Sequence, residues 1–276
     1  MVVAGVSGGA DSSALLVLAA EAGCDVTAVH VDHALRAGSG AEAEAVAALA
    51  RRLGARFEAR RAPVAPGPNL EDRARQARHA ALGPGAMTGH TADDQAETLV
   101  LNLVRGAGLD GLAAMRPGPT KPMLGLRRDD TRRLCRHLGI VAVEDPSNGD
   151  PGVRRNRVRH EIMPLLDAVA QRDVTAVLAR NAGIIAEDAA LLERLAGELD
   201  PRDGRALAGA PLPLARRALR RWLVEARPPY PPDAATLERV LAVARGRWRA
   251  TEVGGGWRVA RHQGRLRLER TGGGEG

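Results

Sequence analysis

Aromatic residues are scarce in this chain, whose 276 residues include three Trp, one Tyr and one Phe, so Leu, Val and Ala must build its core. The two cysteines, Cys24 and Cys135, lie far apart and form no C-x-x-C pair, which excludes a disulfide framework. No apolar run approaches the roughly 18 uncharged residues of a membrane span, and no signal peptide is recognisable. We therefore expect a protein of the reducing cytoplasm with no membrane partner.

Lysine is nearly absent as well, since Lys121 is the single lysine among 40 basic residues. With 33 acidic residues the formal net charge is +7. The planar fork of arginine suits phosphate groups, so this excess favours a nucleic-acid partner over a plain compositional bias. The length allows one large domain or two modest ones.

Residues 2–6 predict a buried strand and residues 14–18 a buried helix. A strand, a glycine turn and a helix start surround an anion with backbone N–H groups and with the positive end of the helix dipole. Glycines let the backbone approach a phosphate, and Asp11 is suited to a divalent cation beside it. We therefore predict a phosphate loop rather than a plain serine-capped turn. Its residues, SGGADSS, are Ser7, Gly8, Gly9, Ala10, Asp11, Ser12 and Ser13.

Strand and helix patterns alternate through the first half of the chain, which predicts an α/β fold with a Rossmann-like parallel sheet wrapped by helices. Further strands are expected at residues 25–31, 55–59, 86–88 and 140–143. Helices are expected at residues 41–53, 69–82, 91–104 and 129–138. Ligands of such folds bind at the carboxyl ends of the strands.

Polar residues follow two of these strands. The strand at 25–31 runs into HVDH, and a lone His30 or His33 there is most simply structural. In NLEDRAR, at 69–75, Glu71 and Arg75 are four apart on a helix. They predict an ion pair or, equally, Arg75 or Arg78 facing nucleotide phosphates.

The string GHTADDQAET, at 89–98, follows the next strand. Thr91 with Asp94 three residues later makes a helix cap, which leaves His90 and Glu97 unexplained. His90, Asp94 and Glu97 can share one helix face. Carboxylates there can hold an amine and take its proton, whereas zinc lacks a fourth ligand.

Four arginines lie within six residues in RRNRVRH: Arg154, Arg155, Arg157 and Arg159. Such a run is often a solvated face, but opposite a phosphate loop it is better interpreted as a phosphate clamp.

These strings resemble the motifs of a known family in the same order. SGGADSS resembles the SGGxDS loop of the PP-loop ATPases, the N-type ATP pyrophosphatases, whose domain is adenine nucleotide alpha hydrolase-like. The strings HVDHALR, NLEDRAR, GHTADDQAET, RGAG with GL, and DPSN with RRNRVRH resemble the tRNA(Ile)-lysidine synthetase family. The resemblance covers residues 2–166. Ala34 replaces a common glycine, the segment between 78 and 89 is short, and Lys121 replaces an arginine.

The resemblance implies roles for particular residues. ATP would lie on residues 7–13 with Mg²⁺ at Asp11 and Asp94, and the adenine would meet the backbone near His30. Asp32 and His90 would lie near the reacting centre, Asp94 and Glu97 would hold lysine, and Arg75 and Arg157 would face nucleotide or RNA phosphates.

The implied reaction is an ATP-dependent C–N ligation. L-lysine would join C2 of the wobble cytidine, position 34, of a CAU-anticodon tRNA(Ile), through an adenylated intermediate, with release of AMP and pyrophosphate. A PP-loop tRNA thiolase and a tRNA-binding protein without turnover are the alternatives. The absence of any C-x-x-C pair argues against the thiolase.

The pattern changes after residue 166, which predicts a catalytic domain at 1–166 and a smaller, mainly helical domain at 167–276. Helices are expected at 173–199, 213–226 and 233–245, followed by two short strands within 251–269 and a disordered tail at 272–276. This basic module resembles the family's tRNA-recognition domain, although a generic helical domain would show the same pattern. A monomer and a homodimer both stay open.

Overall fold

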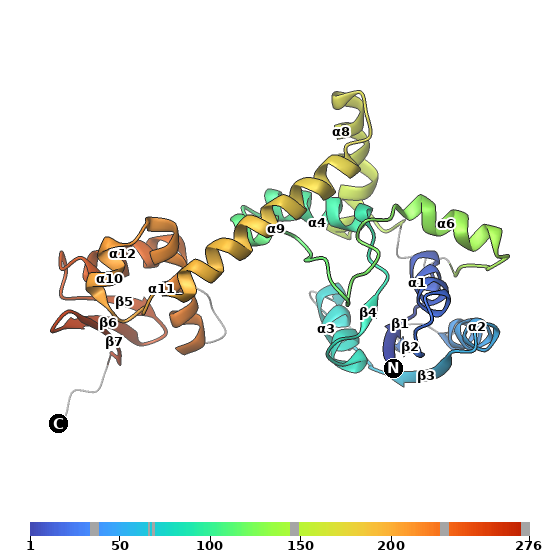
Figure 1. Cartoon of the computed structure of the whole chain (residues 1–276), viewed down its shortest axis with the longest axis horizontal. Coiled ribbons are helices and arrows are strands. Elements are labelled where there is room, and N and C mark those ends of the chain that lie inside the picture. Colours follow the sequence, from blue (N-terminus) through green and yellow to red (C-terminus); the bar gives the residue numbers. More distant parts are fainter. Residues whose placement is uncertain (34–38, 66, 68–69, 144–148, 227–231, 272–276) are drawn as a thin grey trace. The chain divides into compact units, whose positions relative to one another are not determined.

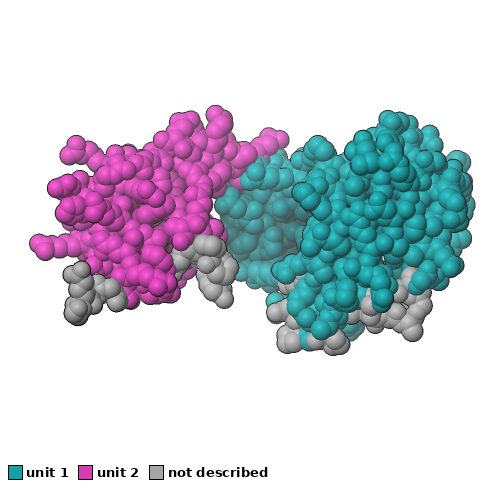
Figure 2. Space-filling view, turned by 90° about the horizontal axis from the view of Figure 1, so that it is seen from below, with its two compact units in different colours: residues 1–186 teal, residues 187–276 magenta. Residues whose placement is uncertain are grey.

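The computed structural model describes residues 1–33, 39–65, 67, 70–143, 149–226 and 232–271. Its chain divides into two compact units, Met1–Ala186 and Glu187–Gly276 (Figure 2). Parts of three motifs lie outside the described residues: residues 34–36, Asn69 and residues 145–148. The predicted tail at 272–276 and the side chain of Glu71 lie outside them too.

A four-stranded parallel sheet organises the first unit and confirms the predicted α/β class (Figure 1). Its strand order is β3-β2-β1-β4. The strands are β1 (Val2–Gly5), β2 (Val26–Asp32), β3 (Arg56–Arg61) and β4 (Met87–Thr88). The helices between and after them are α1 (Ala10–Glu21), α2 (Ser39–Arg52), α3 (Leu70–Leu82), α4 (Ala92–Val104), α5 (Leu109–Leu112) and α6 (Arg128–His137).

Aliphatic and alanine side chains fill the core beneath this sheet, as the scarcity of aromatics requires. Leu15 and Leu16 of α1 are buried against Val46 of α2, and Ala4 and Ala28 of the two central strands complete the cluster. A second cluster joins α4 to the helices η2 (Val158–Ile162, a π-helix) and α8 (Met163–Ala170). The preceding turn of helix, α7 (Arg154–Arg157), also contacts α4.

The prediction of a strand at 140–143 is wrong, because this segment contacts the phosphate loop instead of the sheet. Ile140 follows the end of α6, and the N–H of Val143 donates to the carbonyl oxygen of Gly8 at 3.0 Å. A Cβ on Gly8 would lie 3.1 Å from Val143 Cγ2, so the two segments pack closely. Val143 therefore packs on the loop and Ile140 on the core, while Val141 is exposed, and the segment forms no ladder.

The short β4 brings the next motif to the phosphate loop. It pairs with β1 through only two registers, Ala4 with Met87 and Gly5 with Thr88. Directly after it, a Cβ on Gly89 would lie 2.7 Å from the carbonyl oxygen of Asp11, in the first turn of α1. Only glycine allows this crossing, which fixes His90 and the start of α4.

The second unit has its own core. The helix α9 (Thr175–Gly197) enters it and is followed by α10 (Gly204–Gly209), α11 (Leu212–Ala226) and α12 (Ala234–Ala244). Leu219 and Leu223 of α11 pack with Leu241 of α12 and with Leu266 of a small antiparallel sheet. Among the described residues, no helix has the length and apolar character needed to span a bilayer.

That sheet has three strands where two were predicted: β5 (Ala250–Gly254), β6 (Trp257–His262) and β7 (Arg265–Arg270). Both hairpins have two-residue loops with positive φ, at Gly255–Gly256 and at Gln263–Gly264, the type I′ pattern. Glutamine residues rarely adopt a positive φ, so the turn at Gln263–Gly264 is difficult to detect in the sequence.

Gly89→Ala should lower the free energy of unfolding of the first unit by about 1–3 kcal/mol, because the new methyl group meets backbone atoms that cannot rotate away. The matched control is Gly183→Ala in α9, where no atom lies within 4 Å of the added Cβ. We expect that control to be neutral or stabilising by up to about 1 kcal/mol. Urea denaturation followed by circular dichroism measures both, and equal effects would contradict the steric argument.

Candidate active site

The loop between β1 and α1 has the geometry of an anion site. Gly9 is the N-cap of α1 and no side chain caps the helix, so its first N–H groups are available to a ligand. Gly8 has φ +89°, a left-handed conformation that favours glycine. This arrangement suits the phosphates of a nucleotide.

The serines of the loop divide into two roles. Ser12 and Ser13 are buried and hold the loop itself: Ser12 Oγ donates to the carbonyl of Gly9 at 3.0 Å and accepts the N–H of Ser7 at 3.1 Å. Ser13 Oγ donates to the carbonyl of Gly8 at 3.4 Å. Ser7 is exposed at the mouth of the loop, and its Oγ is within hydrogen-bond distance of Ser12 Oγ, at 3.2 Å.

Arg128, the first residue of α6, joins the loop to the acidic row of α4. Its guanidinium lies 3.0 Å from Asp94 Oδ1, 3.0 Å from Glu97 Oε1 and 3.6 Å from Asp11 Oδ2. The hydroxyl of Thr131, one turn later, donates to Asp11. The structure therefore brings together three of the predicted residues, Asp11, Asp94 and Glu97, around an arginine that the motifs did not single out.

Two further arginines reach the same carboxylates from the arginine tract. Arg155 Nε donates to Glu97 Oε2 at 3.1 Å, and Arg159 binds Glu97 with two nitrogens, at 2.7 and 3.0 Å. Arg155 also contacts Asp94 at 3.2 Å. Three arginines and three carboxylates thus form one charge-balanced cluster, which we call the acid–arginine network: Asp11, Asp94, Glu97, Arg128, Arg155 and Arg159.

The network sets the ionisation of its carboxyl groups. Burial alone would raise the pKa of Asp94, but Arg155, Arg128 and the Thr91 N–H lower it below its usual value. Burial would likewise raise the pKa of Glu97, but Arg159 and Arg128 outweigh this effect and lower it. Burial raises the pKa of Asp11 more than Thr131 and Arg128 lower it. Asp94 and Glu97 are therefore held ionised, whereas Asp11 takes up a proton more readily.

His90 lies beside this row but is uncharged at neutral pH. Its Nδ1 is 2.8 Å from Thr88 Oγ1, at the end of β4. Burial lowers its pKa to about 4, against a smaller opposite effect of Asp94. A neutral imidazole here can form hydrogen bonds with a ligand without adding a positive charge.

The other predicted residues have simpler surroundings. The buried His30 is bonded through Nδ1 to the carbonyl of Val6 at 3.0 Å, so it ties the ends of β2 and β1 together. Asp32 is half-buried at the carboxyl end of β2. Arg75 is exposed on α3, near enough to His90 and Lys121 to help lower the pKa of both.

Arg157 is not brought to the network, because it pairs with Glu161 at 2.9 Å on the exposed side of its helix. Asp93 caps α6 through the N–H of Arg128 at 2.8 Å, and Asp94 caps its own helix through the N–H of Thr91 at 2.9 Å. The predicted capping at Thr91 is therefore confirmed, and it coexists with the contacts of Asp94 to arginine.

Sequence reasoning missed Arg128, although one signal was present. A cation in the first turn of a helix is disfavoured by the dipole, so an arginine there needs acidic partners elsewhere. Arg128 meets this description, and Arg127, at the N-cap of the same helix, pairs with Asp93 and Asp173.

The donor set fits Mg²⁺ together with a nucleotide. Mg²⁺ is usually bound through one or two carboxylates and the substrate's phosphates, and Asp11 and Asp94 are two carboxylates on one arginine. Within the described ranges, no three His, Cys, Asp or Glu side chains are grouped as a protein-only metal site.

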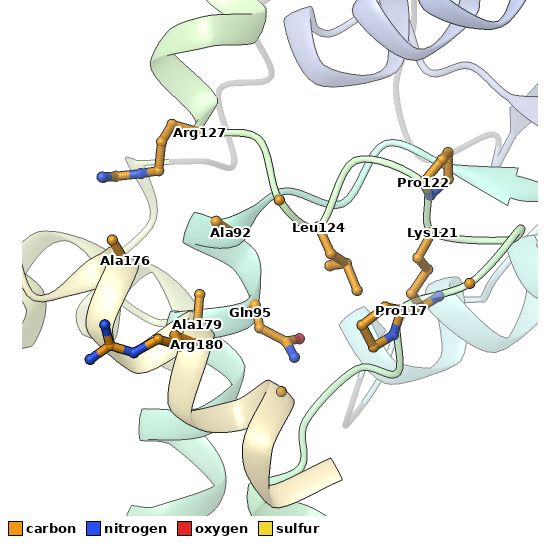
Figure 3. Close-up of a pocket in the computed structure, with 13 residues that line it drawn as sticks. Ala92, Gln95, Pro117, Lys121, Pro122, Leu124, Arg127, Ala176, Ala179 and Arg180 are labelled. Carbon is orange, nitrogen blue, oxygen red and sulfur yellow. The ribbon is translucent and has the colours of Figure 1, made fainter. Parts of the chain in front are cut away.

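A separate pocket of about 750 Å³ lies on the other face of α4 (Figure 3). Ala92 and Gln95 line it, opposite the helix face of Asp94 and Glu97, with Pro117 and Leu124 of the following loop and Ala179 of α9. Gln95 is already bonded through both amide atoms to the backbone of Met115. Figure 3 shows Arg127 and Arg180 pointing to one side and Lys121 lying across from them, so the cations do not converge.

Comparison with known proteins gives consistent matches. A family profile described as the PP-loop domain matches residues 1–166, and one described as the TilS substrate binding domain matches residues 205–267. A tRNA(Ile)-lysidine synthase of Nocardia farcinica (strain IFM 10152) is 43% identical over 291 residues, covering 98% of this chain and 92% of that protein. One from Rhodococcus erythropolis (strain PR4 / NBRC 100887) is 42% identical over 240 residues, covering 81% and 74%.

Among solved structures, the U34-tRNA thiolase NcsA from Methanococcus maripaludis, with its 4Fe-4S cluster, aligns with a TM-score of 0.51 at 17% identity. The alignment covers 72% of this chain and 73% of the thiolase chain, and at this sequence identity the similarity shows the fold alone.

The loop, the parallel sheet and the matching profile together define a PP-loop protein, an α/β fold that uses ATP. The chain belongs to the tRNA(Ile)-lysidine synthase family, whose members are ATP-dependent ligases.

The buried His90 should make stability depend on pH between about 4, its folded pKa, and 6.5, its unfolded value. In this window the unfolded chain binds a proton at His90 that the folded chain does not bind. The free energy of unfolding should therefore fall as pH drops, by up to about 3 kcal/mol. His90→Asn, which keeps a hydrogen-bonding side chain beside Thr88, should lose less stability between pH 7 and pH 4. Urea denaturation at a series of pH values measures this, and an equal pH dependence of the free energy of unfolding in the two proteins would contradict the assignment to His90.

Proposed function

We propose that this chain, in the cytoplasm, ligates L-lysine to C2 of cytidine 34 in a tRNA(Ile) with a CAU anticodon. ATP activates the base as an adenylate, with release of pyrophosphate and then AMP. The observation that carries the proposal is Arg128, whose side chain joins Asp11 of the phosphate loop to Asp94 and Glu97. The matches to the family and to its substrate-binding domain support a tRNA as the partner.

The proposed first step uses the loop. The C2 carbonyl oxygen of the cytidine attacks the α-phosphorus of ATP, the bond to the β-phosphate oxygen breaks, and pyrophosphate leaves against the N–H groups at the start of α1. Mg²⁺ bound by Asp11 and Asp94 would offset charge on these phosphates. Ser7 donates its hydroxyl from the mouth of the loop.

The proposed second step uses the acidic row. The ε-ammonium of lysine binds Asp94 and Glu97, loses a proton and attacks C2, and the C2–O bond to AMP breaks. Asp94 and Glu97 are held ionised, so they are suited to bind the ammonium and to take the proton that it gives up.

The network must exchange partners before lysine can bind. Its three carboxylates are balanced by three arginines, so a cation meets no net negative charge there. Phosphates of ATP and RNA offer the arginines alternative anions and thereby free Asp94 and Glu97. Nucleotide binding should therefore strengthen lysine binding, and by linkage the reverse should hold.

Asp11→Asn should abolish lysidine formation, with a loss of turnover above about 100-fold, because the neutral amide binds Mg²⁺ more weakly than a carboxylate does and cannot balance the charge of Arg128. Mass spectrometry of the cytidine-wobble tRNA after incubation with ATP, lysine and Mg²⁺ measures the product. A wild-type protein that binds this tRNA without releasing pyrophosphate would contradict the proposed reaction, and full activity of the variant would contradict the role of Asp11.

Arg128→Met should uncouple lysine from nucleotide. In the wild type, a non-hydrolysable ATP analogue should tighten lysine binding by about 5- to 150-fold, the usual range of such coupling. In the variant lysine should bind with similar affinity with and without the analogue. Isothermal titration calorimetry measures both, and Arg127→Met, whose partners Asp93 and Asp173 lie outside the network, is the control that should keep the coupling.

A further inference from the structure

The turn between α12 and β5, two elements labelled in Figure 1, contains an exposed tryptophan among arginines. Its sequence is RGRWR, residues 245–249. Trp248 is 49% exposed, whereas Trp222 is 6% exposed and Trp257 is half-buried under Arg270, whose guanidinium carbon is 5.4 Å from the ring centroid. In a chain with so few aromatics, an indole held at the surface is not needed for packing.

Backbone bonds fix this turn. The N–H of Gly246 donates to Val243 at 3.0 Å and that of Arg247 to Ala242 at 2.9 Å, the Schellman pattern that ends a helix. Gly246 has φ +75°, as the pattern requires. On the far side, Arg261 of β6 donates its N–H to the carbonyl of Arg249 at 2.9 Å. Trp248 is therefore carried on an ordered backbone, which reduces the entropy lost when a ligand covers it.

The arginines around it have no acidic partner among the described residues. Arg245, Arg247 and Arg249 are exposed, and none of them forms an ion pair or side-chain hydrogen bond with another described residue. Arg261 lies beneath them: a Cβ on Gly246 would collide with its Nη1, and its buried Nε has no hydrogen-bond partner among the described residues. Other arginines of this unit are paired, such as Arg216 with Glu238 and Arg258 with Glu269.

We infer that residues 245–249 form a contact site for unpaired RNA, in which the indole of Trp248 stacks on a base and the arginines bind the flanking phosphates. An acidic protein or a duplex backbone would need the charges but not the exposed ring. An aromatic face beside arginines is the combination that binds single-stranded nucleic acid. The inference rests on the proposed function, since it takes the RNA to be the tRNA substrate.

Trp248→Ala should weaken binding of a CAU-anticodon tRNA(Ile) transcript and of a short oligouridine by about 10-fold, as loss of one stacked base does. Trp248→Phe keeps a stacking face and should retain most of the affinity. A duplex RNA of similar length is the matched control probe, and its affinity for Trp248→Ala should equal its affinity for the wild type. Wild-type affinity of Trp248→Ala for the oligouridine, or an equal loss on the duplex, would overturn the stacking role.

The charges have a separate readout. Replacing both Arg247 and Arg249 by Ala should reduce the slope of log K against log salt concentration by about 1.4 for the single strand, while Trp248→Ala should leave the slope unchanged. Oligouridine should also quench the indole emission of the wild type, and Trp248→Phe should lose this quenching while still binding. Quenching that persists in Trp248→Phe would assign the contact to another tryptophan and overturn the inference.

Enzyme kinetics separate this inference from the proposed function. Trp248→Ala should raise the KM for tRNA by about 10-fold with kcat unchanged, because the turn lies outside the catalytic residues. A wild-type protein that forms no lysidine would count against the proposed function alone. Normal lysidine formation with an unchanged KM in Trp248→Ala would overturn the inference while leaving the proposed function intact.

Discussion

Glu97 keeps its charge in a nearly closed interior, at 2% exposure, because three arginines surround it. A buried carboxylate without such partners would be neutralised or would unfold its surroundings. Its partners start from different elements, Arg128 from α6, and Arg155 and Arg159 from α7 and η2. Satisfying one carboxylate therefore holds three segments against α4, and through Arg128 against the phosphate loop.

Local patterns were sufficient for most of the first unit. The alternation of β-branched strands with alanine- and leucine-rich helices placed β1, β2 and the flanking helices, and Thr91 with Asp94 located the start of α4. The errors came where tertiary contacts decide. Residues 140–143 have strand-like composition, yet they pair with no strand of the sheet in the described residues. Instead, the N–H of Val143 bonds to Gly8 of the phosphate loop. In the second unit, a glutamine in the left-handed region hid the turn between β6 and β7.

The site was predictable to the extent that its residues stand in contiguous strings. Asp11, Asp94 and Glu97 were found in this way, but what surrounds them was not. Arg155 and Arg159 are four residues apart and so share a helix face, and the same holds for Arg157 and Glu161. Only packing against α4 decides which of these two faces turns inward. The role of Arg128 depends on its contact with Asp11, which lies 117 residues earlier in the sequence, and no local spacing encodes such a contact.

The two cysteines differ in solvent exposure, so their reaction with a thiol reagent can report on the motion of one part of the chain. Cys135 is buried on α6 with Sγ 3.4 Å from the carbonyl of Ala10, in the first turn of α1, and burial raises its pKa. Cys24 is exposed. Since alkylation needs an accessible thiolate, iodoacetamide should modify Cys24 faster than Cys135, whose thiol becomes accessible when α6 separates from α1. The ratio of the two labelling rates therefore reports local opening of the nucleotide loop in the unmutated protein.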